Sequence, residues 1–199
     1  MRIVMIVLLA GISACISTPV LADDLSTSQM IQQLQPKKTL TRSLTVTKSS
    51  MSSEDQQFVD GLQGNTRSIV VEEREKLTEV VQKYDMPKLD LEVYFDFNSS
   101  NISQVAIPTL IKLGQTLNDP SLVKQRIIVS GHTDAVGSDD SNQKLSQARA
   151  LSVKAFLVDN FQIDSQRLIA VGYGEYQLKD TADPEADENR RVTIVNIVM

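Results

Sequence analysis

The second half of the chain alternates between short apolar segments of period two and longer segments of helical period, and this alternation limits the fold most. The four short segments are typical of strands: 91–97, 126–131, 167–174 and 190–198. The two longer segments are typical of helices: 103–117 and 141–161. The order β-α-β-α-β-loop-β predicts a two-layer α/β sandwich, in which the helices pack on the sheet.

The first 22 residues are typical of a signal peptide. Arg2 precedes the apolar run Ile3–Ile16, which is shorter than the roughly 20 residues of a membrane-spanning helix. "STPVLA" then places short side chains before Asp23, which predicts cleavage there and export to the periplasm. A second interpretation stays open, because "ISAC" resembles a lipobox. Cys15 would then be acylated, and the protein would be an outer-membrane lipoprotein.

The segment between the leader and the alternating half has a different character. Residues 23–54 are rich in Ser, Thr, Gln and Lys and are expected to be flexible. Residues 55–88 are expected to be a partly helical linker, with an amphipathic helix over 70–84 that ends before Pro87. The remaining residues, 89–199, are expected to form the globular domain.

Composition argues against several functional classes. The net charge is −5, aromatic residues make up 5% and Trp is absent, whereas nucleic-acid binding asks for a basic face and stacking rings. The chain has one histidine, and its single cysteine, Cys15, is lost if cleavage falls before Asp23. "DAVGSDD" also lacks the ligand spacing of a calcium loop. We therefore expect no nucleic-acid partner, metal or cofactor.

One strand-to-helix junction, Gly131–Val153, concentrates polar residues. At about 100° per residue, Arg149 and Asn142 fall within the apolar arc of the following helix, together with Leu145. A guanidinium in that position needs an anionic or strongly accepting partner. Asp134 ends the preceding strand and can supply it. Two interpretations remain: a structural salt bridge, or a pocket whose anion and cation bind the two charged groups of an amino acid.

A hydrolase is a weaker interpretation of the same junction. Ser130, His132 and Asp134 alternate on one face of a strand, where neighbours are about two rises of 3.3 Å apart. A catalytic triad needs contacts of about 3 Å, and usually gathers residues from distant segments. We therefore expect no catalysis, and we expect His132 to hydrogen-bond within the turn.

Three separated motifs together resemble the OmpA C-terminal-like family of peptidoglycan-binding domains. They are "YFDFNSSNI", "GHTDAVGSDDSNQKLSQARALSV" and "VGYGE" followed by "NRRV", in that order between Leu91 and Val198. The resemblance implies a β-α-β-α-β-β domain with helices on one face of a mixed four-stranded sheet. It also implies non-catalytic binding of the diaminopimelate residue of the peptidoglycan stem peptide, which anchors an exported envelope protein to the cell wall.

The resemblance also assigns residues to the ligand. Asp134 and Arg149 would hold its amino and carboxylate groups. The other residues expected at the site are Asn98 and Asn142 as hydrogen-bonding groups, Thr133 and Leu145 as pocket lining, and Arg190 as a further contact. "GEYQL" departs from the family by lacking a proline after Gly-Glu. The resemblance therefore does not assign the residues at the rim of the pocket. The alternatives are an interaction protein whose residues 23–88 bind an outer-membrane or envelope protein, and, third, an exported hydrolase.

Overall fold

The computed structural model describes residues 25–36, 51–62, 71–96 and 98–198. The expected signal peptide and Cys15 lie outside these residues. The order β-α-β-α-β-β is confirmed in a mixed four-stranded sheet with strand order β1-β4-β2-β3. β2 and β3 are parallel, and β4 is antiparallel to both β1 and β2. The strands are β1 (Lys88–Leu91), β2 (Arg126–His132), β3 (Leu168–Gly174) and β4 (Val192–Ile197).

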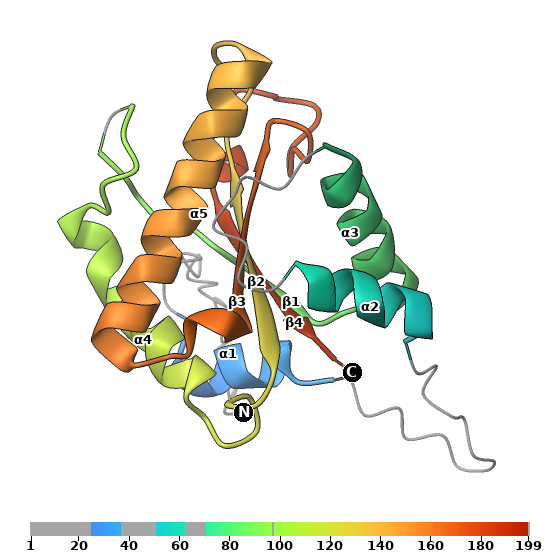
Figure 1. Ribbon diagram of the computed structural model, residues 1–199. Helices are drawn as coiled ribbons and strands as arrows, with labels where there is room; N and C mark the ends of the chain where they lie inside the picture. Colours follow the sequence, from blue (N-terminus) through green and yellow to red (C-terminus); the bar gives the residue numbers. More distant parts are fainter. Residues whose placement is uncertain (1–24, 37–50, 63–70, 97, 199) are drawn as a thin grey trace, which may run out of the picture.

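Helices α4 (Ile107–Leu117) and α5 (Asp139–Phe161) cover one face of the sheet (Figure 1). Their apolar residues, among them Leu113 and Leu157, share a buried cluster with Ile127 and Val129 of β2. Pro108 stands in the first turn of α4, where a missing N–H costs least, so the α-helix begins later than the expected segment 103–117. A short 3₁₀ turn, Gln104–Ala106, precedes it.

A third layer covers the opposite face of the sheet (Figure 1). It consists of α2 (Ser53–Gly61) and α3 (Val71–Lys83), which share a second buried cluster with outward residues of the sheet such as Ile128. The helix over 70–84 is thus confirmed, but the sequence did not place it on the sheet. Because β2 is apolar at consecutive positions, both of its faces needed cover, and that is the signal for a further layer.

The two helices of this layer are joined at Asp55. Its carboxylate accepts hydrogen bonds from Lys83 Nζ and from the Tyr84 hydroxyl, both at 2.8 Å. These bonds, with that from Ser52, lower the pKa of Asp55 to about 2. Asp55 is therefore ionised at neutral pH and fixes α2 against the end of α3.

The expectation of a flexible segment over residues 23–54 is wrong for residues 27–34, which form α1 (Thr27–Leu34). Ser26 and Gln29 form a reciprocal capping box at its start. Met30 and Leu34 are fully buried in the core cluster, and Asn196 Nδ2 donates to the Leu34 carbonyl at 2.8 Å. Two buried apolar residues one turn apart outweigh a polar composition. Residues 37–50 lie outside the described part of the chain.

The first strand also differs from the expected 91–97. β1 spans Lys88–Leu91, and the chain then leaves the sheet, with Phe95 in an isolated bridge to Ile102. The cause is a tight turn, in which Asp96 N donates to the Asn101 carbonyl at 3.0 Å and Asn98 has a φ of 48°. Asn tolerates this left-handed conformation, so the turn folds the alternating segment back on itself.

Side chains of α5 close the free edge of β3. Gln147 Nε2 donates to the Ala170 carbonyl at 3.2 Å, and its Oε1 accepts from Gly172 N at 2.7 Å. Ser146 Oγ accepts from Gly174 N at 2.8 Å. The side-chain amide of Gln147 thus takes the place of a neighbouring strand, and the edge offers no free backbone for another chain at these positions.

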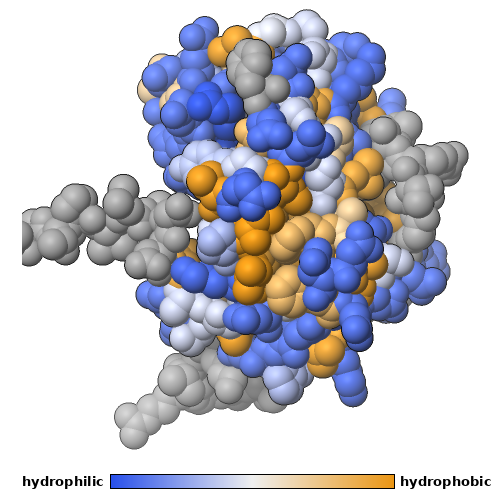
Figure 2. Space-filling model, turned by 90° about the vertical axis from the view of Figure 1, so that its left-hand side faces the viewer, coloured by the Kyte–Doolittle hydropathy of each residue, from blue (hydrophilic) through white to orange (hydrophobic). Residues whose placement is uncertain are grey.

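Figure 2 shows the face formed by α4 and α5, where apolar side chains gather near the middle and hydrophilic ones surround them. Ile111 of α4 and Leu151 of α5 are the exposed large apolar residues of these two helices. In the parts of the chain that the structure describes, no helix combines the length and apolar character needed to cross a membrane.

Candidate functional site

Asp134 lies in the loop after β2 and is 9% exposed. Its Oδ2 accepts a charge-assisted hydrogen bond from Arg190 Nη1 at 2.6 Å, and its Oδ1 accepts from Val136 N at 3.2 Å. Arg190 also donates to Asp187, so one guanidinium joins two carboxylates. The loop thereby presents a nearly buried carboxylate whose direct partner is Arg190.

Arg149 projects from α5 and is half-buried. Its Nε donates to the Ser99 carbonyl at 3.1 Å, and its guanidinium lies 4.9 Å from the centroid of the Phe95 ring. Burial lowers the pKa of Arg149, the Asp134 charge raises it, and the Arg190 charge lowers it. Among the described residues, no carboxylate forms an ion pair with Arg149. The direct Asp134–Arg149 salt bridge, one of the two open interpretations, is therefore not the arrangement present.

A cavity of about 200 Å³ opens beside Arg149. Asp134 is not a lining residue of this cavity, but its carboxylate accepts a hydrogen bond from Arg190, which is. The cavity therefore combines two guanidinium groups with carboxylates and aromatic rings, which suits a small ligand bearing both charges. Its lining residues are Glu92, Val93, Tyr94, Phe95, Arg149, Asp187 and Arg190.

Asn142 fixes the shape of the loop that carries Asp134. Its Nδ2 donates to the carbonyls of Asp134 at 3.3 Å and Val136 at 3.2 Å, and to Glu175 Oε2 at 2.7 Å. Asn142 is 5% exposed, so these bonds replace lost contacts with water. Asn142, expected as a hydrogen-bonding group of the site, thus bonds other residues of the protein and holds the loop in place.

The remaining expected residues lie around this centre. Thr133 N donates to the Gly174 carbonyl at 3.0 Å, while Thr133 Oγ1 is buried without a hydrogen-bond partner in the described structure. Leu145 is half-buried on α5, one turn before Arg149. Asn98 is exposed in the turn that presents the Ser99 carbonyl to Arg149. The structure thus brings Asp134, Arg149 and Arg190 together, and places the others at the periphery.

Comparison with known proteins assigns this arrangement to a family. A sequence profile of the OmpA family matches residues 94–192, a range that contains Asp134, Arg149 and Arg190. Residues 94–192 therefore form an OmpA-family domain. The residues of the OmpA-family domain that surround the cavity come from its first turn, from α5 and from the loop before β4.

Three similar proteins show how far the likeness extends. Outer membrane porin F of Pseudomonas aeruginosa is 37% identical over 111 residues, which cover 54% of this chain and 31% of that protein. The peptidoglycan-associated lipoprotein of Buchnera aphidicola is 32% identical over 105 residues, covering 52% and 59%. A solved peptidoglycan-associated lipoprotein from Burkholderia pseudomallei is 28% identical with a TM-score of 0.45, covering 53% of this chain and 88% of that one. The chain spans 31%, 28% and 28% of the first three curated relatives.

Asn189 organises the acidic loop of the OmpA-family domain, a role that sequence reasoning missed. Its Oδ1 accepts from Lys179 N at 2.7 Å and Asp180 N at 2.9 Å. Its Nδ2 donates to the carbonyls of Asp180, Asp183 and Pro184 at 3.0 to 3.1 Å. The residue is fully buried, and it fixes the loop that carries Asp187 and Arg190. A single Asn in "ENRRV" gives no sequence signal for this role.

The expectation that His132 hydrogen-bonds within the turn is wrong. Both ring nitrogens are buried and lack a hydrogen-bond partner among the described residues. The imidazole ring stacks on the Tyr173 ring, with 5.4 Å between the two ring centroids. Burial, and to a smaller extent the Arg191 charge, lower the pKa of His132 to about 3. No hydrogen bond joins it to Ser130 or Asp134, so the described geometry gives the hydrolase interpretation no support. The described residues also contain no group of His, Cys, Asp and Glu able to hold a metal.

The buried His132 should make the protein less stable in mild acid. In the unfolded chain it binds a proton near its ordinary pKa of about 6.5, while the folded form stays neutral down to about 3. Stability should therefore fall as pH drops from about 6.5 toward 4, by up to about 1.4 kcal/mol per pH unit. Because the chain has one histidine, His132→Phe should flatten this slope in urea unfolding measured at several pH values. If stability depends on pH as steeply in His132→Phe as in the wild type, His132 is not the cause of the acid sensitivity.

Proposed function

We propose that the domain binds peptidoglycan without making or breaking a bond, and that it recognises the free amino-acid group of diaminopimelate in the stem peptide. Arg149 receives the ligand carboxylate and Asp134 receives its ammonium group. Asn142, Thr133, Leu145 and Asn98 shape the pocket around this pair. An exported protein with such a domain is anchored noncovalently to the cell wall in the periplasm.

The observation that carries the proposal is the environment of Arg149. Its guanidinium is half-buried, yet the contacts that hold it are a backbone carbonyl and an aromatic ring rather than an ion pair with a carboxylate. The bond from Nε to Ser99 and the contact with Phe95 hold the group in one orientation beside the cavity. A cation fixed in this way loses little entropy when a carboxylate binds its terminal nitrogens in a bidentate manner.

Arg190 explains how Asp134 remains stable before the ligand arrives. A nearly buried carboxylate without a cation would cost several kcal/mol, and Arg190 supplies the cation at 2.6 Å. The Arg190 side chain is 42% exposed and is also held by Asp187, so it can leave Asp134 without losing every partner. A ligand ammonium group can then take its place on Asp134. A ligand without that group leaves the carboxylate with Arg190 and binds less well.

The names of two similar proteins support attachment to the cell wall. One of the matching proteins is named a peptidoglycan-associated lipoprotein, and another is a solved cell wall anchor of a secretion system from Pseudomonas aeruginosa. Both names concern attachment to the wall. Together with the cavity geometry, they favour a binding module over the alternative of a scaffold whose residues 23–88 capture an envelope partner.

Binding to isolated sacculi tests the proposal. The Asp134→Asn variant should sediment with diaminopimelate-containing sacculi at least about thirtyfold less than the wild type, because a buried acceptor loses its charge. Free diaminopimelate should compete with the wild type. Asp140→Asn is the matched control, since Asp140 is exposed at the start of α5 and pairs only with Lys144 in the described structure. Equal sedimentation of both variants with the wild type would exclude the pocket as the binding site.

Export and attachment are a separate part of the proposal. The leader pattern supports cleavage before Asp23 and a periplasmic chain, and the alternative is acylation at Cys15 with attachment to the outer membrane. The mass of the mature amino terminus distinguishes the two, because only the second product carries lipid on Cys15.

A further inference from the structure

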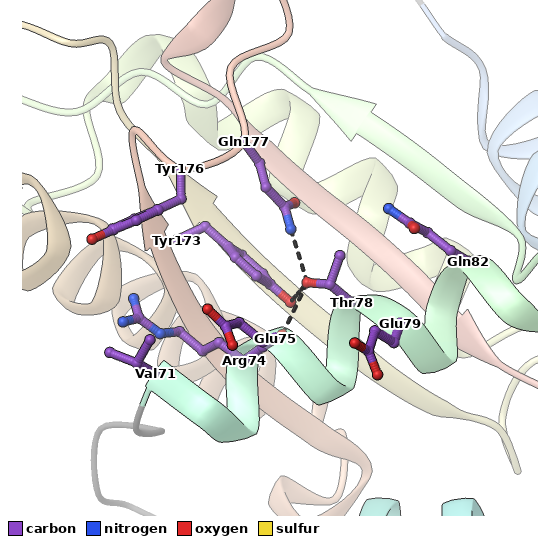
Figure 3. Close-up of a pocket in the computed structure, with 9 residues that line it drawn as sticks. All are labelled: Val71, Arg74, Glu75, Thr78, Glu79, Gln82, Tyr173, Tyr176 and Gln177. Atoms are coloured by element: carbon purple, nitrogen blue, oxygen red, sulfur yellow. Dashed lines mark hydrogen bonds between the residues drawn. The ribbon is translucent and has the colours of Figure 1, made fainter.

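A second concave site lies away from the Asp134–Arg149 pocket, between α3 and the chain that follows β3. Its volume is about 480 Å³, within the range of small-molecule sites. Figure 3 shows the side chains that surround it, with α3 on one side and two tyrosines on the other. We call it the α3 groove; it is lined by Val71, Arg74, Glu75, Thr78, Glu79, Gln82, Tyr173, Tyr176 and Gln177.

Arg74 gives the groove a fixed donor. The residue is 7% exposed, and its Nη1 donates to the Gly172 carbonyl at 3.1 Å and to the Gln143 side chain. No carboxylate forms an ion pair with Arg74 in the described structure. A guanidinium held by neutral acceptors keeps donor capacity on its other nitrogens, and these can serve a ligand oxygen.

Two tyrosines give the groove its apolar surfaces. Tyr176 is 66% exposed, and its ring lies over the Arg74 guanidinium, with 5.8 Å between the ring centroid and the guanidinium carbon. Tyr173 is buried at the base, with its hydroxyl 3.4 Å from Thr78 Oγ1. An exposed ring at the edge of a cavity can pack against an apolar face of a ligand.

Polar groups surround these rings, and hydrogen bonds hold two of them, Thr78 and Gln177. Thr78 Oγ1 accepts from Gln177 Nε2 at 2.9 Å and donates to the Arg74 carbonyl at 2.9 Å. Glu75, Glu79 and Gln82 project from successive turns of α3 along the groove (Figure 3). The groove therefore offers amide donors and acceptors, carboxylate acceptors and one guanidinium, spread along its length.

We propose that the α3 groove binds a neutral saccharide carrying N-acetyl groups. Sugar rings present C–H faces that pack on aromatic rings, and hydroxyl and acetamido groups that pair with amides and carboxylates. The two glutamates disfavour an anionic ligand and accept well from hydroxyl groups. The inference rests on the proposed function for the source of the saccharide, which is the glycan strand of the wall, while the ligand class follows from the groove itself.

The two sites flank the first turns of α5. Asn142 bonds the loop of Asp134, and its neighbour Gln143 receives the Arg74 bond. A stem peptide in one site and its glycan in the other would raise the overall affinity for the wall through effective concentration. We therefore expect the α3 groove to add to sacculus binding rather than to replace the Asp134–Arg149 pocket.

Titration of the full chain with an N-acetylglucosamine tetramer tests the inference by calorimetry. The wild type should show saturable binding, and Tyr176→Ala should weaken it about tenfold, the size expected for one aromatic contact. Tyr176→Phe is the matched control and should bind as the wild type does, because it keeps the ring. Tyr176 is exposed, so both variants should fold. Gln82→Ala, also an exposed change, should weaken binding severalfold through a lost hydrogen bond.

The outcomes separate this inference from the proposed function. If the tetramer does not bind, or binds Tyr176→Ala equally well, the saccharide inference is overturned, whatever the sacculus result. Saturable binding of a lysine-rich peptide, with no binding of the tetramer, would assign the groove to a peptide and overturn the inference as well. If the tetramer binds as expected but Asp134→Asn sediments normally with sacculi, the groove stands and the Asp134–Arg149 pocket fails.

Discussion

Replacing Arg149 by lysine is expected to reduce the affinity for diaminopimelate-containing muropeptides by about a hundredfold, which corresponds to about 2.7 kcal/mol. Lysine keeps the positive charge, so charge alone does not account for the loss. The ammonium group lacks the planar fork that binds a carboxylate through two parallel bonds. It also gives up the donation from Nε to Ser99 and the contact of the guanidinium with Phe95, which together hold Arg149 in place.

Isothermal titration with a purified muropeptide measures this effect, and the urea midpoint provides the control for folding. The midpoint should change little, because Arg149 is only half-buried and no carboxylate is left without its cation. Arg126→Lys is the matched control, since Arg126 begins β2, far from the carboxyl end where Asp134 follows. An Arg149→Lys variant with wild-type affinity would show that the ligand carboxylate binds elsewhere, with Arg190 as the first candidate.

Sequence reasoning predicted those parts of the site that depend on local pattern. The helical phase placed Arg149 within the apolar arc of α5, where the structure shows it half-buried, and the end of β2 placed Asp134 near it. Sequence reasoning could not predict the Asp134–Arg190 bond, because 56 residues separate the two residues. Their approach depends on the loop that Asn189 holds. The turn around Asn98 was missed for a similar reason, since the alternation of apolar residues continues through it.

For the fold, too, sequence reasoning predicted the local elements but not all of their long-range packing. The order of strands and helices followed from periodicity, whereas the cover of the second sheet face did not. Only contacts such as those of Leu77 and Val80 with Ile128 reveal that α3 belongs to the core. Likewise, no periodic pattern marks Gln147 in the sequence, yet its side-chain amide hydrogen-bonds the backbone at the edge of β3. Long-range hydrogen bonds of this kind leave no periodic trace in the sequence.

The close approach of α5 to the sheet predicts the largest effect on stability. A Cβ added at Gly131 would lie 2.2 Å from the Ser146 carbonyl oxygen, and one added at Gly172 would lie 2.4 Å from Gln147 N. In both cases the obstacle is backbone, so no side chain can rotate away. Gly131→Ala should therefore destabilise the fold by about 3 kcal/mol or more, since α5 must move off β2.

Urea unfolding measures the loss, and Gly61→Ala is the control, because a Cβ at Gly61 meets nothing within 4 Å. A Gly131→Ala variant within about 0.5 kcal/mol of the wild type would contradict the close packing. The consequence extends to binding, because α5 carries both Asn142 and Arg149. Where the folded fraction of Gly131→Ala is still high, its sacculus binding should already be reduced. Small displacements of α5 change the distance between the guanidinium and the loop of Asp134, and a two-point pocket depends on that distance.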